Sequence, residues 1–153
     1  MNSHPPLRTN RRRHAALLFG CLALALAAAP APSHAQETTD QRFDSLFGAH
    51  EPYRAFFQTL RTAIAKGDAK GVAALVSYPL SVRIGGKKTT IANAAAFERH
   101  YAQIVTPALR RAVAEQEYDD LFANWQGVSI GDGTLWFSGM GDSQEVRITA
   151  INN

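Results

Sequence analysis

The sequence NWQGVSIGDGTLWF (residues 124–137) decides the fold that we expect of this chain. Apolar and polar residues alternate on both sides of Gly131-Asp132-Gly133, which has the composition of a tight turn. Because successive side chains of a strand point to opposite faces, this alternation places one face against a core and leaves the other polar. We therefore expect strands over residues 123–130, 134–138 and 145–151, with a loop over residues 139–143.

Helical spacing replaces this alternation nearer the N-terminus. Apolar residues recur every three or four positions over residues 51–66, and Gly67 follows as a helix-ending residue. Asp68 has the side chain of an N-cap and is expected to begin a short helix over residues 68–76, which ends before Tyr78-Pro79.

A hairpin and two further helices complete the pattern. Residues 80–84 and 87–91 are expected to form strands on either side of Gly85-Gly86. Asn93 can cap a third helix. A fourth helix starts at Pro107, with apolar positions at Leu109 and Val113 and, at its far end, Tyr118, Leu121 and Phe122. Helices on one side of a mainly antiparallel sheet make an α+β domain.

The first 35 residues have the pattern of a secretory signal peptide. Arg11-Arg12-Arg13 precede an apolar run over residues 15–29, and Ser33-His34-Ala35 matches the small-x-small cleavage pattern. As a helix the run spans about 22 Å, short of the ~30 Å core of a bilayer, so cleavage is favoured over a stable membrane anchor. We expect cleavage near Ala35, a flexible lead-in over residues 36–49, one domain over residues 50–153, and a periplasmic or secreted bacterial protein.

The leader also sets the charge and the thiol content of the remaining chain. It holds four of the 16 lysines and arginines and no acid, so the chain from Gln36 carries 12 basic and 13 acidic residues. Nucleic-acid binding therefore loses its main electrostatic support. The one cysteine, Cys21, would leave with the leader, which excludes thiol chemistry. Weaker alternatives are a lipoprotein signal at Cys21 and a twin-arginine signal, both of which match incompletely.

The order of elements resembles the nuclear-transport-factor-2-like (cystatin-like cone) superfamily. The resemblance rests on the helix over residues 53–66 with its Gly67-Asp68 break, the short helix leading to Tyr78-Pro79-Leu80, and the meander over residues 124–137. It covers residues 50–151 and is similar to small exported bacterial members without an assigned activity. It implies a curved, mainly antiparallel sheet packed against three to four helices as a cone with an internal pocket. Such domains act as isomerases, as dehydratases, or as binding or dimerising modules.

Local motifs for catalysis and cofactor binding are missing from the sequence. His50 and His100 belong to no H-x-x-x-H or H-E-x-x-H pattern, so we expect no metal site. The glycine pair of residues 85–86 fails as a phosphate loop, because Ser81 and Lys88 stand where that motif requires glycine and Ser/Thr. No G-x-S-x-G nucleophile occurs, and no acid lies within an apolar strand. We expect no cofactor.

Polar and aromatic side chains near the expected pocket are the candidate ligand-binding residues. Amide and guanidinium groups between aromatic walls suit a small organic ligand, including an anionic one, although the solvent face of a sheet has the same pattern. The candidates are Tyr78, His100, Tyr101, Asn124, Trp125, Gln126, Trp136 and Arg147.

These residues favour an exported non-enzymatic module that binds a small ligand or a protein partner. One alternative is a cofactor-independent isomerase or lyase of the ketosteroid-isomerase kind, with His100, Tyr78 or Tyr101 handling protons. Another is an immunity or inhibitor protein that acts through its sheet face. Since family members often pack sheet against sheet, the resemblance also implies a homodimer. A filled interior with exposed Trp125 or Trp136 would favour a protein partner.

Overall fold

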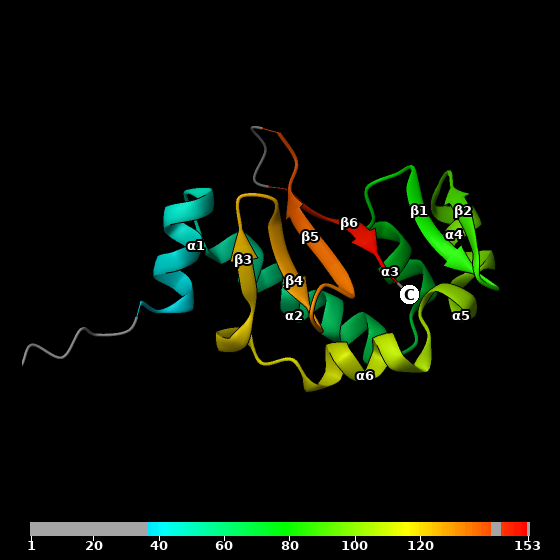
Figure 1. Ribbon diagram of the computed structural model, residues 1–153, viewed down its shortest axis with the longest axis horizontal. Coiled ribbons are helices and arrows are strands. Elements are labelled where there is room, and N and C mark those ends of the chain that lie inside the picture. Colours follow the sequence, from blue (N-terminus) through cyan, green and yellow to red (C-terminus); the bar gives the residue numbers. More distant parts are fainter. Residues whose placement is uncertain (1–36, 142–144, 153) are drawn as a thin grey trace, which may run out of the picture. The chain divides into compact units, whose positions relative to one another are not determined.

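The computed structural model describes residues 37–141 and 145–152, all within the second of the chain's two units, residues 35–153 (Figure 1). The expected signal peptide and cleavage site lie outside the described residues. Helices and antiparallel sheets alternate along the described chain, which confirms the expected α+β class. Within residues 37–141 and 145–152, none of the helices has the length and apolar character needed to cross a membrane.

Two features mark the starts of the first three helices, which are α1 (Thr39–Phe47), α2 (Glu51–Ala65) and α3 (Ala69–Ala74). At α1 and α3 a side chain accepts a hydrogen bond from a free backbone N–H group, and at α2 a proline in the first turn has no N–H group to satisfy. Thr38 forms a capping box with Gln41 at α1, and the Asp68 side chain accepts from Gly71 N at α3. Within the expected lead-in, where the sequence also allows a turn of helix around Phe43, Leu46 and Phe47, this capping and the full burial of Phe43 stabilise α1.

The middle helices are shorter than expected. Asn93 caps α4 (Ala94–Arg99), as predicted, and α5 (Tyr101–Ile104) follows as one turn. Thr106 caps α6 (Pro107–Glu115), which ends when Gln116 adopts an extended backbone. The expected extension toward residue 122 is instead a separate 3-10 turn, η1 (Tyr118–Asp120).

The strands form a hairpin and a four-stranded meander, both antiparallel. The hairpin pairs β1 (Leu80–Ile84) with β2 (Lys87–Ile91), as predicted. The meander runs in chain order through β3 (Phe122–Asn124), β4 (Gly127–Ile130), β5 (Leu135–Gly139) and β6 (Val146–Ile151). A parallel bridge between Val76 and Ile148 joins the end of the α3 segment to β6.

The expected single strand over residues 123–130 was wrong, because the chain turns at Trp125-Gln126. Asn124 Oδ1 accepts a hydrogen bond from Gln126 N at 2.8 Å, which closes the turn. Gly127 then has φ 137°, and a Cβ there would lie 2.6 Å from the Phe137 carbonyl oxygen. Only glycine fits this conformation and this close approach to β5, so Gly127 sets the boundary of β4.

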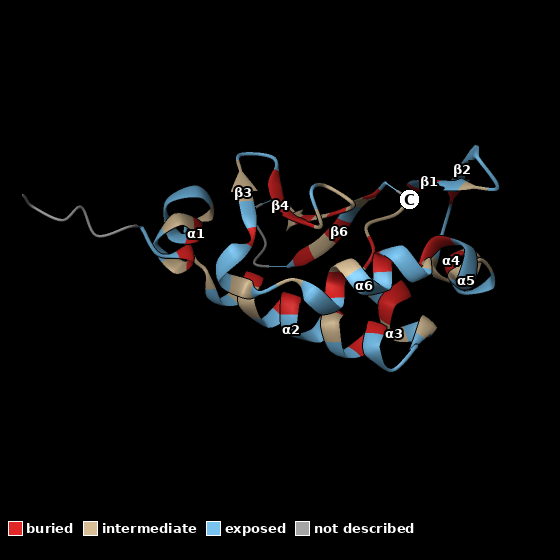
Figure 2. Cartoon of the chain, turned by 60° about the horizontal axis from the view of Figure 1, so that its bottom comes forward, coloured by how far each residue is buried: buried red, intermediate tan, exposed pale blue. Residues whose placement is uncertain are grey.

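The inner face of the meander packs against α2. The register places Val128, Phe137 and Ile148 in one row across β4, β5 and β6, and all three are fully buried. The Phe137 ring lies 4.9 Å from the ring of Phe56 and 6.4 Å from that of Tyr53. Figure 2 shows buried positions recurring along α2, as its helical spacing predicts. These side chains belong to one continuous core.

A second row lies on the outer face of the same sheet. The register pairs Phe122 with Ser129, Ser129 with Trp136, and Trp136 with Ala150. The Phe122 side chain is 57% exposed. The next residue of β3, Ala123, pairs with Val128 of the inner row. The outer face is therefore aromatic as well as polar.

Loss of a phenyl ring should lower the stability of the fold more on the inner face of the sheet than on the outer face. We expect Phe137→Ala to lower the free energy of unfolding by about 3–5 kcal/mol, because it leaves a cavity beside Phe56 and Tyr53. The matched control Phe122→Ala should cost less than about 1 kcal/mol, since that ring is largely exposed. Urea unfolding measures both values, and equal losses would contradict this assignment of faces.

Candidate functional site

Of the candidates Tyr78, His100 and Tyr101, the first follows α3, whereas His100 and Tyr101 are neighbours at the junction of α4 and α5. The Tyr78 hydroxyl donates to the Ala73 carbonyl at 2.9 Å, and burial raises the pKa of Tyr78 to about 12. His100 Nδ1 lies 2.8 Å from Gln103 Oε1, three residues along the chain. The Tyr101 hydroxyl is buried without a hydrogen-bond partner among the described residues, and burial raises its pKa.

Arg147 lies on β6 and ties that strand to α3. Its guanidinium donates to the Ala74 carbonyl and to the Glu145 carboxylate. The positive charge of Arg147 lowers the pKa of Tyr78, but burial raises that pKa by more. Arg147 thus helps to hold β6 against the α3 segment.

Asn124 is the last residue of β3, and Trp125 and Gln126 form the β3–β4 turn. Trp125 is 82% exposed at this turn. Trp136, on the outer face of β5, pairs with Phe122, a residue that the sequence did not single out as functional. Their ring centroids lie 6.1 Å apart at 85°, an edge-to-face arrangement. We call Phe122, Trp125 and Trp136 the aromatic face.

A groove of about 310 Å³ opens beside the Phe122–Trp136 pair. Ser129, which the register places between the two rings, is only 4% exposed. A Cβ on Gly133 would lie 3.2 Å from Trp136 Nε1, so the indole rests against the backbone of the β4–β5 turn. The lining consists of Gln116, Asp120, Phe122, Ser129, Asp132, Gly133 and Trp136.

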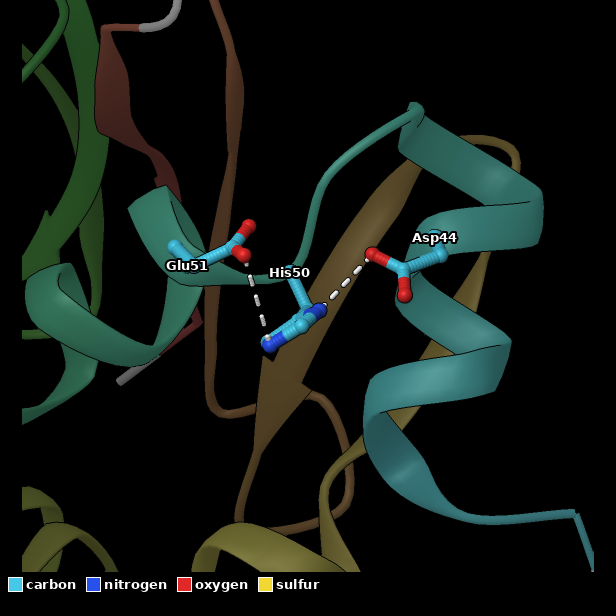
Figure 3. Close-up of side chains that lie close together, drawn as sticks. All are labelled: Asp44, His50 and Glu51. Carbon is cyan, nitrogen blue, oxygen red and sulfur yellow. Dashed lines mark hydrogen bonds and ion pairs between the residues drawn. The ribbon is translucent and has the colours of Figure 1, made fainter.

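A second cluster joins α1 to the start of α2 around His50. His50 Nδ1 lies 2.8 Å from Asp44 Oδ1, while Nε2 lies 3.8 Å from Glu51 Oε1 (Figure 3). The hydrogen bond to Asp44, followed by the nearby carboxylate charges, raises the pKa of His50. The His50 ring therefore links the last turns of α1 to the start of α2.

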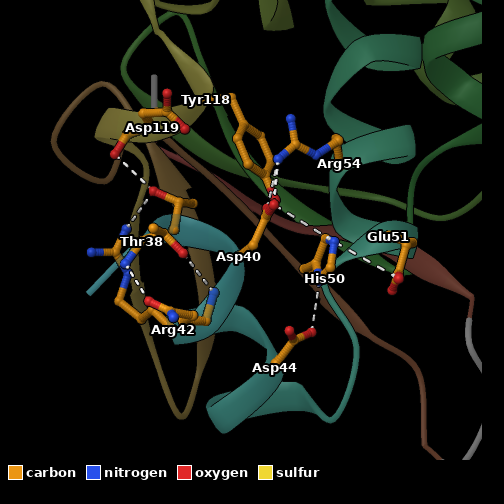
Figure 4. Close-up of polar contacts among 11 residues, drawn as sticks. Thr38, Asp40, Arg42, Asp44, His50, Glu51, Arg54, Tyr118 and Asp119 are labelled. Atoms are coloured by element: carbon orange, nitrogen blue, oxygen red, sulfur yellow. Dashed lines mark hydrogen bonds and ion pairs between the residues drawn. The ribbon is translucent and has the colours of Figure 1, made fainter. Parts of the chain in front are cut away.

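Asp40 extends this cluster toward η1 (Figure 4). One terminal nitrogen of Arg54 lies 2.6 and 2.7 Å from the two Asp40 oxygens, and the Tyr118 hydroxyl donates to Asp40 Oδ1 at 2.9 Å. The Arg54 guanidinium also stands 4.0 Å from the centre of the Tyr118 ring. The hydrogen bond from Arg54 is the main cause that holds the pKa of Asp40 below its usual value.

The chemistry of this cluster suits either ion pairing or a metal ion. The ligand atoms of Asp44, His50 and Glu51 lie within 4.8 Å of one another, and carboxylate and imidazole groups bind zinc. His50 already lies within ion-pair distance of both of these carboxylates. Sequence spacing missed the cluster because Asp44 and His50 are six residues apart and meet only when α1 and α2 pack.

The His50 cluster predicts a pH dependence of stability. Because the folded-state pKa of His50 is raised above 6.5, its contribution is fully present below that pH and is lost as pH rises through the folded-state pKa. Asp40 behaves oppositely: its contribution is present above pH 3.8 and is lost as pH falls through its lowered pKa.

We therefore expect His50→Gln to flatten the decline of the unfolding midpoint as the pH rises above about 6.5. The control His100→Gln lies outside the cluster and should keep the decline of the unaltered protein. Thermal melts across this pH range measure the effect. An unchanged slope in His50→Gln would show that the ring does not link the helices.

Comparison with models of known protein families, with curated proteins and with solved structures finds no match to this chain.

Proposed function

We propose that the protein is an exported, non-enzymatic member of the nuclear-transport-factor-2-like cone superfamily. It binds a protein partner through the outer face of its four-stranded sheet. The observation that carries this proposal is the aromatic face, with Trp125 82% and Phe122 57% exposed. Burying one such side chain at an interface contributes about 1.5–3 kcal/mol, and aromatic residues dominate the energetic centres of interfaces.

The filled interior of the domain supports a partner on its surface rather than a ligand inside. Phe56 and Phe137 meet between α2 and the sheet, where the resemblance to the cone superfamily implies a pocket. Both rings are at least nine-tenths buried and belong to the continuous core. We propose that the chain has the element order of the cone superfamily. The close packing of these rings leaves little room for an open hollow.

The isomerase alternative requires a proton-handling group aimed at a common substrate. Tyr78 donates to Ala73, and His100 contacts Gln103 within its own segment. Tyr78 and His100 are thus used locally, and the Tyr101 hydroxyl is buried without a hydrogen-bond partner among the described residues, whereas the aromatic face is open to a partner. The non-enzymatic proposal therefore accounts for more of the observed contacts.

Export to the periplasm or beyond rests on the leader. Its arginines, apolar run and small-x-small site form the three parts of a signal peptide, and cleavage near Ala35 would remove the one cysteine. A thiol-free, nearly neutral domain suits an oxidising compartment.

Site-specific photo-crosslinking tests the proposed surface. With p-benzoylphenylalanine in place of Trp125, in the full chain expressed with its leader, we expect a discrete crosslinked species. Adding Phe122→Ser should reduce its yield at least fivefold, since the substitution removes the other largely exposed ring of the aromatic face. A species of twice the chain's mass would identify a second copy as the partner.

The matched control carries the crosslinker at Lys87, an exposed residue next to the Gly85-Gly86 turn of the other hairpin. It should give no species that depends on Phe122. Equal crosslinking from both positions, or none from position 125, would contradict binding through the aromatic face.

A further inference from the structure

We infer that the groove beside the Phe122–Trp136 pair receives an arginine side chain of the protein partner. This inference rests on the proposed function and names the chemistry that the partner presents. The groove is about 310 Å³, at the lower limit of ligand pockets, so it suits one long side chain better than a metabolite.

The charge of the groove favours a cation. Asp120 and Asp132 line it from two different segments, η1 and the β4–β5 turn. No lysine, arginine or histidine is among its lining residues in the described part of the chain. No ion pair to either carboxylate is formed within residues 37–141 and 145–152. An anionic ligand would meet two like charges here, whereas a cation would neutralise them.

The aromatic pair adds a second attraction for the same charge. Ring faces carry the negative part of the aromatic quadrupole, and tryptophan is the strongest of these partners for a cation. The indole of Trp136 is held in place, because its Nε1 end rests on Gly133. The Gly133 carbonyl in turn accepts a hydrogen bond from Asn152 Nδ2 at 2.8 Å, which ties the turn to the C-terminal strand.

Arginine fits these two features better than lysine does. Its guanidinium is planar, stacks on aromatic faces and presents several N–H donors to carboxylates at once. The groove offers an aromatic wall from Phe122 and Trp136 and carboxylates from Asp120 and Asp132. A partner strand or loop lying across the sheet could therefore insert one arginine between them.

The probe for this inference is the peptide acetyl-(Arg)4-amide, with the neutral acetyl-(citrulline)4-amide as its isosteric control. Binding is followed in the purified protein by NMR, using the indole N–H signals of Trp125 and Trp136, which are the two tryptophans of the chain. We expect the arginine peptide to shift the Trp136 signal in a saturable way. The citrulline peptide should bind at least tenfold more weakly.

Substitution of the carboxylates separates the groove from general electrostatic attraction. Asp120→Asn combined with Asp132→Asn should weaken peptide binding at least fivefold. Asparagine tolerates the positive φ of 52° at position 132, so the turn should persist. The matched control Glu98→Gln removes an exposed carboxylate on α4, which contributes nothing to the groove, and should leave affinity within twofold.

Equal binding of the two peptides, or equal losses from the Asp and Glu98 variants, would overturn the inference. It would also be overturned if the arginine peptide shifted the Trp125 signal and left the Trp136 signal unchanged. The two proposals fail separately. Loss of crosslinking at position 125 refutes the partner surface, whereas persistent crosslinking without arginine-specific binding refutes only the cation groove.

Discussion

The packing of Phe137 against Phe56 and Tyr53 is the interaction on which the rest of this structure depends. It joins the centre of the four-stranded sheet to the longest described helix, and it fixes which face of every strand is inside. Because side chains alternate along β5, burying Phe137 turns Trp136 outward. The same packing brings three aromatic rings together between α2 and the inner face of the sheet. The strand register that buries Phe137 in the core thus also places Trp136 on the outer face.

The outer face and the His50 cluster use polar groups in different ways. In the His50 cluster, Asp44 and Asp40 of α1 pair with His50 and Arg54. These contacts hold α1 against α2. Around Trp136, Asp120 and Asp132 border a groove that has no lysine, arginine or histidine among its described lining residues. The proposed function thus assigns stability and recognition to different carboxylates. This division explains why the groove, rather than the larger polar cluster, is the better candidate for binding.

Local signals predicted much of this fold. The Gly85-Gly86 turn and its alternating flanks predicted β1 and β2, and helical spacing predicted α2 to within one residue. The division between β3 and β4 could not be predicted, because it depends on the approach of Gly127 to β5. Trp125 and Trp136 were recognised as candidates, but Phe122 was not, since its place beside Trp136 follows only from the strand register. His50 met its acidic partners only through the packing of α1 on α2.

A crystal structure determined under xenon pressure tests most directly whether the interior is solid. Xenon occupies apolar cavities and leaves close-packed cores empty. The account predicts no xenon site between α2 and the inner face of the sheet, where Phe56, Phe137 and Ile148 are packed. An ordered xenon atom bounded by these side chains would reveal an open hollow and contradict the assignment of binding to the outer face.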